Sequence, residues 1–163
     1  MAEGAGGMTY IRMMMDILNK KETHLEKILE YTTRQEEILK GEVFSEEEFD
    51  ALIEKKQGLI QKIEEFDEGF QSVYNRMAEE LAANKEQYKE QILTMQEQIL
   101  RVTDLGVRLT TLEQKNRAGL ELRLRDRKKG IKQFKVSKQT ADKYYKNMIG
   151  MQTGASYFMD KKK

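Results

Sequence analysis

Apolar residues recur at intervals of three and four along most of the chain. Between residues 8 and 40 they are Ile11, Met14, Met15, Ile17, Leu18, Leu25, Ile28, Leu29, Ile38 and Leu39. This spacing places apolar side chains on one face of an α-helix, whereas a half-buried strand would alternate every second residue. The pattern predicts a helix over residues 8–40. Lys40 supplies a positive charge in its last turn, and Gly41, just beyond it, can adopt a positive φ.

The start of a second helix is marked by Ser45, which is followed by three glutamates. In a capping box, the Ser45 hydroxyl accepts a hydrogen bond from the Glu48 amide, and the Glu48 side chain reaches back to the Ser45 amide. Phe44 and Phe49 flank this box as a hydrophobic staple. The pattern predicts a helix over residues 46–82, antiparallel to the first because the turn between them is short.

The apolar pattern thins over residues 81–86 and then resumes, which predicts a second reversal and a third helix over 86–149. An uninterrupted helix through 81–86 is the alternative. The third helix would be roughly 95 Å long and the first roughly 50 Å, so the third would overhang by about 40 Å. Its apolar face would then need a partner, a second copy or a fold-back.

These elements predict an all-α fold: an elongated antiparallel helical hairpin or three-helix bundle with a long protruding C-terminal helix. Residues 8–149 would form one domain. Residues 1–7 are expected to be disordered and residues 150–163 to be a mobile tail.

Composition excludes several classes of protein. The 163 residues include no proline, cysteine or tryptophan. A disulfide scaffold, a thiolate zinc site and a cysteine nucleophile are therefore excluded. No apolar run approaches the roughly 18 residues that a membrane span needs, and residues 1–7 do not resemble a secretory signal. We expect a soluble, cytoplasmic protein without a membrane span.

Charge is distributed unevenly despite a net charge of +1. Residues 42–70 carry ten acidic side chains and three lysines, whereas residues 101–135 carry eleven basic and four acidic ones. We interpret these regions as helix faces that complement each other. A basic nucleic-acid binder is a third alternative for the function, but Phe134 is the only aromatic residue within 117–135, so base stacking is poorly supported. Nucleic acid is not a predicted partner.

Catalytic chemistry has little support in the sequence. His24 is the only histidine and lacks a Glu-x-x-His partner, which favours a packed structural imidazole. Glu46, Glu47 and Glu48 point in different directions on a helix, and no glycine-rich phosphate loop follows a strand. We predict no catalytic residue, metal ligand or cofactor, and no enzyme activity.

The methionines fall into two groups. Met13, Met14 and Met15 fit a role in filling the core, whereas Met148, Met151 and Met159 crowd the other end of the chain, where no covering segment is visible. An open apolar face on a charged protein indicates an interaction site.

Two stretches resemble FlgN-type flagellar export chaperones. Residues 49–63 read FDALIEKKQGLIQKI, a lysine-rich run followed by paired aliphatics, similar to the second helix of that family. Residues 102–117, with VTDLG and LEQKNR, are similar to its third helix. The resemblance covers about residues 8–135.

This resemblance implies a cytosolic chaperone that binds the amphipathic C-terminal helix of hook-associated proteins. The chaperone would prevent their premature assembly and deliver them to the flagellar export gate. The matching client-binding positions, which also belong to the predicted overhang, are Leu120, Leu124, Ile131, Phe134, Tyr145 and Met148. A tyrosine of the family's C-terminal part contacts the export gate, and Tyr144, Tyr145 and Tyr157 all qualify here.

The first alternative function is a structural coiled-coil scaffold, in which two overhanging helices cover each other in a homodimer. Sedimentation would distinguish this dimer from a monomeric chaperone.

Overall fold

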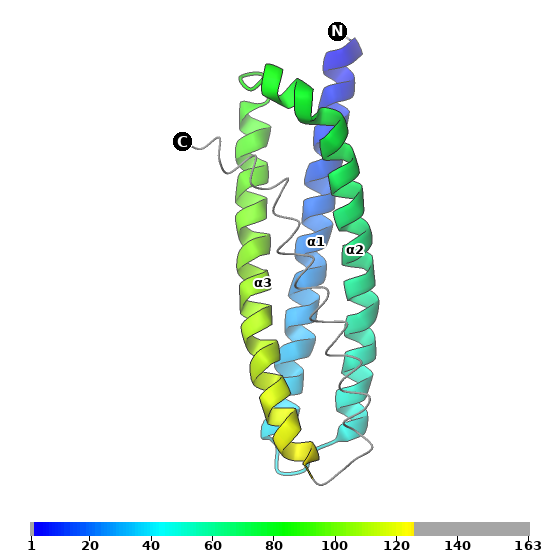
Figure 1. The fold of residues 1–163 in the computed structure, drawn as a ribbon, viewed down its shortest axis with the longest axis vertical. Coiled ribbons are helices and arrows are strands. Elements are labelled where there is room, and N and C mark those ends of the chain that lie inside the picture. Colours follow the sequence, from blue (N-terminus) through cyan, green and yellow to red (C-terminus); the bar gives the residue numbers. More distant parts are fainter. Residues whose placement is uncertain (1, 126–163) are drawn as a thin grey trace.

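The computed structural model describes residues 2–125, and their side chains from residue 6 onward. Three helices follow one another along the chain: α1 (Ala2–Lys40), α2 (Glu46–Ala83) and α3 (Lys89–Leu124). They form an elongated antiparallel bundle, and no strand occurs among the described residues (Figure 1). The all-α, three-helix prediction is confirmed.

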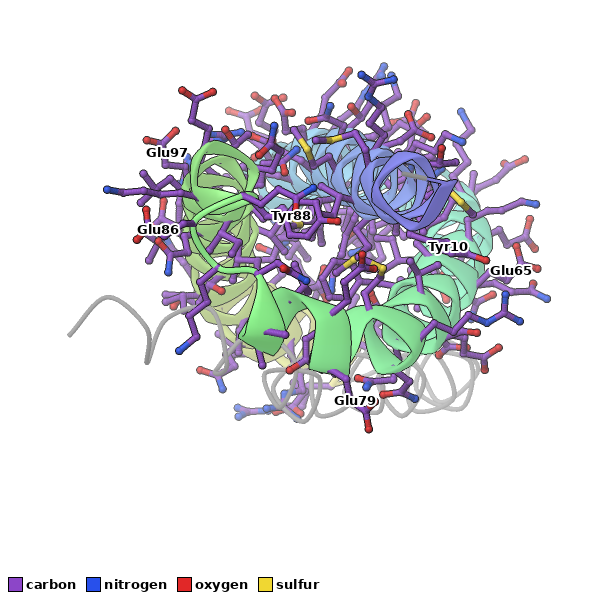
Figure 2. All side chains as sticks on the ribbon, turned by 90° about the horizontal axis from the view of Figure 1, so that it is seen from above. Tyr10, Glu65, Glu79, Glu86, Tyr88 and Glu97 are labelled. Carbon is purple, nitrogen blue, oxygen red and sulfur yellow. The ribbon has the colours of Figure 1, made fainter. Side chains whose placement is uncertain are left out.

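The N-terminal end of α1 is part of the bundle. Because α1 begins at Ala2, the expectation that residues 1–7 are disordered is wrong for residues 2–7. Gly7 is buried, and a Cβ there would clash with the Tyr88 hydroxyl and lie 2.9 Å from Glu80 Oε1. Glycine therefore lets α1 pack closely against the connection between α2 and α3, where Tyr88 points inward (Figure 2).

The loop between α1 and α2 carries the predicted cap. Ser45 Oγ accepts a hydrogen bond from the Glu48 amide at 3.3 Å, and the rings of Phe44 and Phe49 lie 5.8 Å apart. The serine cap and the hydrophobic staple are confirmed. Gly41 does not use positive φ; its amide instead donates to the carbonyls of Glu37 and Ile38.

The second reversal lies at residues 84–88, which excludes the uninterrupted helix. Asn84 caps α2 by donating its backbone N–H to the Glu80 carbonyl at 2.9 Å. Tyr88 is fully buried, and its hydroxyl donates to Glu80 Oε1 at 3.1 Å. α3 therefore begins at Lys89 rather than at residue 86, because Tyr88 closes the end of the bundle. Residues 126–149 of the predicted third helix, and the predicted tail, lie outside the described residues.

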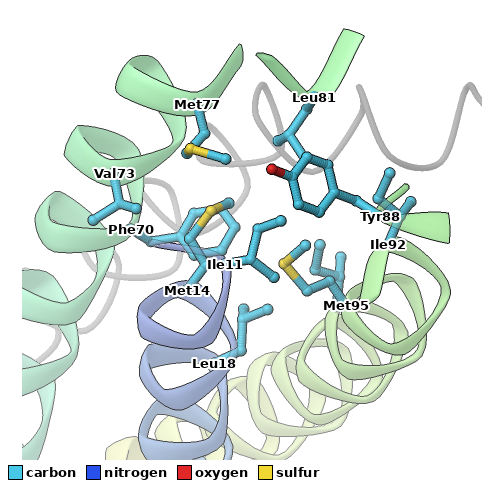
Figure 3. Close-up of a cluster of buried hydrophobic side chains, with 11 residues drawn as sticks. Ile11, Met14, Leu18, Phe70, Val73, Met77, Leu81, Tyr88, Ile92 and Met95 are labelled. Carbon is cyan, nitrogen blue, oxygen red and sulfur yellow. The ribbon is translucent and has the colours of Figure 1, made fainter. Parts of the chain in front are cut away.

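The core consists of three apolar clusters along the bundle. The upper cluster joins Ile11 and Met14 of α1 to Phe70 and Met77 of α2 and to Met95 of α3 (Figure 3). The middle cluster comprises Leu25, Ile28, Ile60, Ile63, Val102, Leu105 and Leu109. The lower cluster comprises Phe49, Ile53, Leu120 and Leu124.

α1 is the central helix of this arrangement. It packs along both α2 and α3, whereas α2 and α3 approach each other much less closely. Seen along the bundle axis, α2 and α3 flank α1 (Figure 2). We call the side opposite α1, between α2 and α3, the open side; no fourth helix covers it among residues 2–125.

Candidate functional site

Polar side chains interrupt the apolar core at two levels. Between the upper and middle clusters, Lys21 Nζ lies 2.8 Å from Asp67 Oδ1, and both side chains are buried. At the same level, Gln98 of α3 donates to the Met15 carbonyl at 3.1 Å and to Asn19 Oδ1 at 2.9 Å. We call this group the upper polar layer; it ties α1 to both other helices.

A larger group, the lower polar layer, separates the middle and lower clusters. Lys56 of α2 pairs with Glu113 of α3 and donates to Gln35 Oε1 of α1 at 2.6 Å. Thr32 Oγ1 accepts from Lys56 at 3.3 Å, and Asn116 donates to the Thr32 carbonyl at 2.9 Å. All three helices therefore meet in one hydrogen-bonded network.

Burial shifts the pKa values of two of these charged groups. Desolvation lowers the pKa of Lys56, and the nearby Glu113 carboxylate opposes that shift. Desolvation raises the pKa of Asp67, although Lys21 beside it acts in the opposite direction. Buried ion pairs are costly to desolvate and add little net stability, but a different alignment of the helices would leave each buried charge without its partner. We therefore expect the two layers to favour this alignment of the three helices.

Neither layer offers the set of ligands that a metal ion needs. No group of three or more histidine, aspartate or glutamate side chains in the described part of the chain is placed to hold a metal ion. His24 is half-buried, with its ring edge-on to Phe66 at 4.9 Å and Nδ1 2.9 Å from the Lys20 carbonyl. His24 is thus the packed imidazole that the sequence indicates.

The structure places Leu120 and Leu124 inside the bundle. Each is 2% exposed in the lower cluster, against Phe49 and Ile53 of α2. The expectation that these two leucines belong to an uncovered overhang is wrong, because their part of α3 lies beside the start of α2. Arg123 closes this end by donating to the carbonyls of Leu39 and Gly41.

The other four predicted client-binding residues are not placed. Ile131, Phe134, Tyr145 and Met148 lie outside the described residues. The structure therefore brings only Leu120 and Leu124 together, and it does so in the core.

Sequence reasoning missed a row of exposed aliphatic side chains on α3. Leu93, Leu100 and Val107 are 46%, 45% and 60% exposed and recur every seven residues, so they share one side of the helix. We call them the α3 row. Gln98 bonds to α1, and Leu100 is two residues later, about 200° further round the helix, so the row faces away from α1. The sequence signal that could have revealed the α3 row is its seven-residue spacing, next to the stripe of buried residues on the same helix.

Acidic side chains border the α3 row. Glu97 and Asp104 lie four residues after Leu93 and Leu100, on the neighbouring face, and both are exposed. A partner for this surface would combine apolar side chains with flanking basic ones.

Comparisons of the chain with protein-family models, curated proteins and solved structures find no match. None of the described helices combines the length and hydrophobicity needed to cross a bilayer.

Proposed function

We propose that this chain is a FlgN-type export chaperone that acts in the cytoplasm. It binds the amphipathic C-terminal helix of hook-associated flagellar proteins, prevents their premature assembly and delivers them to the export apparatus. The resemblance of residues 49–63 and 102–117 to that family suggests this function, and the elongated three-helix fold is compatible with it.

The observation that carries the proposal is the α3 row. A helix laid against it would insert apolar side chains spaced by three, four and seven residues between Leu93, Leu100 and Val107. The row extends over 15 residues, a rise of about 21 Å, which corresponds to about four turns of a client helix. Capture of an amphipathic helix on an exposed aliphatic row needs no catalytic group.

The C-terminal segment supplies the remaining contacts in this proposal. Ile131, Phe134, Tyr145 and Met148 follow one another at spacings of three, eleven and three residues, so on a helix they would share a face. The tyrosine that contacts the export gate would be Tyr144, Tyr145 or Tyr157. The proposed client-binding surface does not include Leu120 and Leu124, because both are buried in the lower cluster.

Titration with peptides from the C-terminal helices of hook-associated proteins tests this function. Leu100→Asp in the α3 row and Phe134→Asp in the C-terminal segment should each weaken binding by at least about tenfold. Met13→Asp on α1 is the matched control, because Met13 and Leu100 are both 45% exposed. Full binding by both test variants, with helicity unchanged, would rule this surface out.

The same row also favours the scaffold alternative, because two copies could cover each other's aliphatic side chains. Sedimentation distinguishes the two functions. A tight homodimer without affinity for any client helix would replace the chaperone proposal with the scaffold.

A further inference from the structure

Acidic side chains line one flank of the α3 row. Glu97 and Asp104 follow Leu93 and Leu100 by four residues, and Glu90 precedes Leu93 by three. On a helix, these steps turn each carboxylate about 40–60° to the same side of the row. All three side chains are exposed, and the ion pairs among the described residues do not include them. We call them the acidic border.

The opposite flank of the row carries no acidic side chain. The positions three residues after each member of the row are Gln96, Thr103 and Thr110, and Lys89 lies on this flank four residues before Leu93. The charge beside the row is therefore asymmetric, because one flank is negative and the other is neutral or positive.

The acidic border lies between the α3 row and α1. Arg101, further round α3 in the same direction, pairs with Glu22 of α1 at 3.0 Å. Arg108 lines the groove between α1 and α3 together with Glu30. Both arginines lie about 100° round from the row and toward α1, whereas Glu97 of the acidic border points away from the bundle (Figure 2). A helix lying on the row would therefore meet the acidic border before it meets either arginine.

From this asymmetry we propose that the α3 row selects an amphipathic helix whose basic side chains lie along one flank of its apolar stripe. The stripe covers Leu93, Leu100 and Val107, and the basic flank lies over the acidic border. A helix with acidic side chains on that flank is repelled. This inference rests on the proposed function, because it specifies the chemistry of the client helix.

The asymmetric charge also sets the direction of the bound helix. Two antiparallel helices packed face to face bring equivalent flanks together, whereas two parallel helices bring opposite flanks together. Lysines four residues after each apolar residue of the stripe therefore reach the acidic border when the bound helix runs antiparallel to α3. Lysines three residues after it lie on the other flank, so they reach the acidic border when the helix runs parallel to α3.

Three synthetic peptides test the selection. Each is an alanine-rich helix of about 18 residues with a leucine at every seventh position. The first peptide carries lysines four residues after the leucines, the second carries glutamates at those positions, and the third carries lysines three residues after the leucines. The first and third peptides should bind about tenfold more tightly than the second, and this difference should shrink at high salt.

Charge reversal on the protein checks that the acidic border causes the selection. Glu97→Lys should weaken binding of the first peptide and strengthen binding of the second, each by about threefold. Glu79→Lys is the matched control, because Glu79 is exposed on α2 and points in another direction (Figure 2). Equal effects of the two variants would mean that only the net charge matters, which would overturn the proposal.

The direction of binding is measured between two spin labels, one on the N-terminus of each peptide and one on Gln114→Cys. Gln114 is exposed and lies seven residues after Val107, and the chain contains no other cysteine. The label on the first peptide should lie close to residue 114, and the label on the third should lie far from it, near the other end of the row. Equal distances for the two peptides would overturn the assigned directions.

The peptide titrations also separate this inference from the chaperone function. If the three peptides bind equally and Leu100→Asp blocks them all, the charge selection is wrong, while the α3 row remains a helix-binding surface. If no peptide binds, or if all bind Leu100→Asp as tightly as the wild type, the inference is also wrong. Titration with the C-terminal helices of hook-associated proteins then decides the chaperone function independently.

Discussion

Replacing Lys56 by methionine tests the account of the lower polar layer. Lys56 is 6% exposed and donates to Glu113 of α3 and to Gln35 and Thr32 of α1. Lys56→Met keeps the length of the stem but removes the ammonium, so the Glu113 carboxylate loses its partner. The change therefore perturbs one charge and its hydrogen bonds and leaves the volume nearly unchanged.

The expected magnitude follows from the burial of the remaining partner. Removing one member of a fully buried ion pair costs about 3–5 kcal/mol. The side chain of Glu113 is 23% exposed, so water can solvate the orphaned carboxylate in part, and we expect a loss of about 1–3 kcal/mol. Replacing both partners, as Lys56→Met/Glu113→Leu, should lie within about 1 kcal/mol of the wild type.

Urea unfolding followed by circular dichroism at neutral pH gives the free energy of unfolding of all four proteins in this double-mutant cycle: the wild type, Lys56→Met, Glu113→Leu and the double variant. The coupling energy should be about 1–3 kcal/mol, with the double variant more stable than Lys56→Met. Strictly additive losses, with the double variant the least stable of the four, would refute the reasoning that an isolated charge causes the destabilisation.

Three further predictions concern the fold. The pKa of Asp67 is raised in the folded state, so folded Asp67 keeps its proton to a higher pH than unfolded Asp67. The free energy of unfolding should therefore fall as pH rises through the raised pKa. Asp67→Asn should remove this pH dependence, as measured by urea unfolding at a series of pH values. Gly7→Ala should lower the free energy of unfolding, measured by thermal denaturation, by about 1–3 kcal/mol. Gly58→Ala, with open space around it, should raise this free energy by about 0.5–1 kcal/mol. Equal effects of the two substitutions would contradict the close packing at Gly7. Leu124→Asp should cost about 3 kcal/mol or more in chemical unfolding, while Leu122→Asp, at 66% exposure, should cost less than about 0.5 kcal/mol; similar losses would contradict the burial of Leu124.

Local features of the fold were readable from the sequence because their causes are local. The three-and-four spacing set the helices, and Ser45 with Phe44 and Phe49 set the start of α2 through contacts within five residues. The reversal near residue 84 could be placed only approximately, since a buried tyrosine rather than a glycine or proline closes it.

The interior polar layers could not be predicted in the same way. Lys56 and Asp67 stand among many exposed charges, and only the packing of three helices decides which of them becomes buried. The placement of Leu120 and Leu124 failed for a related reason: their neighbours Phe49 and Ile53 lie some 70 residues away in the sequence. The α3 row was visible as a period of seven, but a single sequence does not show which side of a helix remains uncovered.

Sedimentation with and without the C-terminal helix of a hook-associated protein tests the central claim most directly. A chaperone should sediment as a monomer and form a one-to-one complex with the client helix, and Leu100→Asp should prevent that complex while Met13→Asp permits it. A stable homodimer that takes up no client helix from any hook-associated protein would contradict the proposed function.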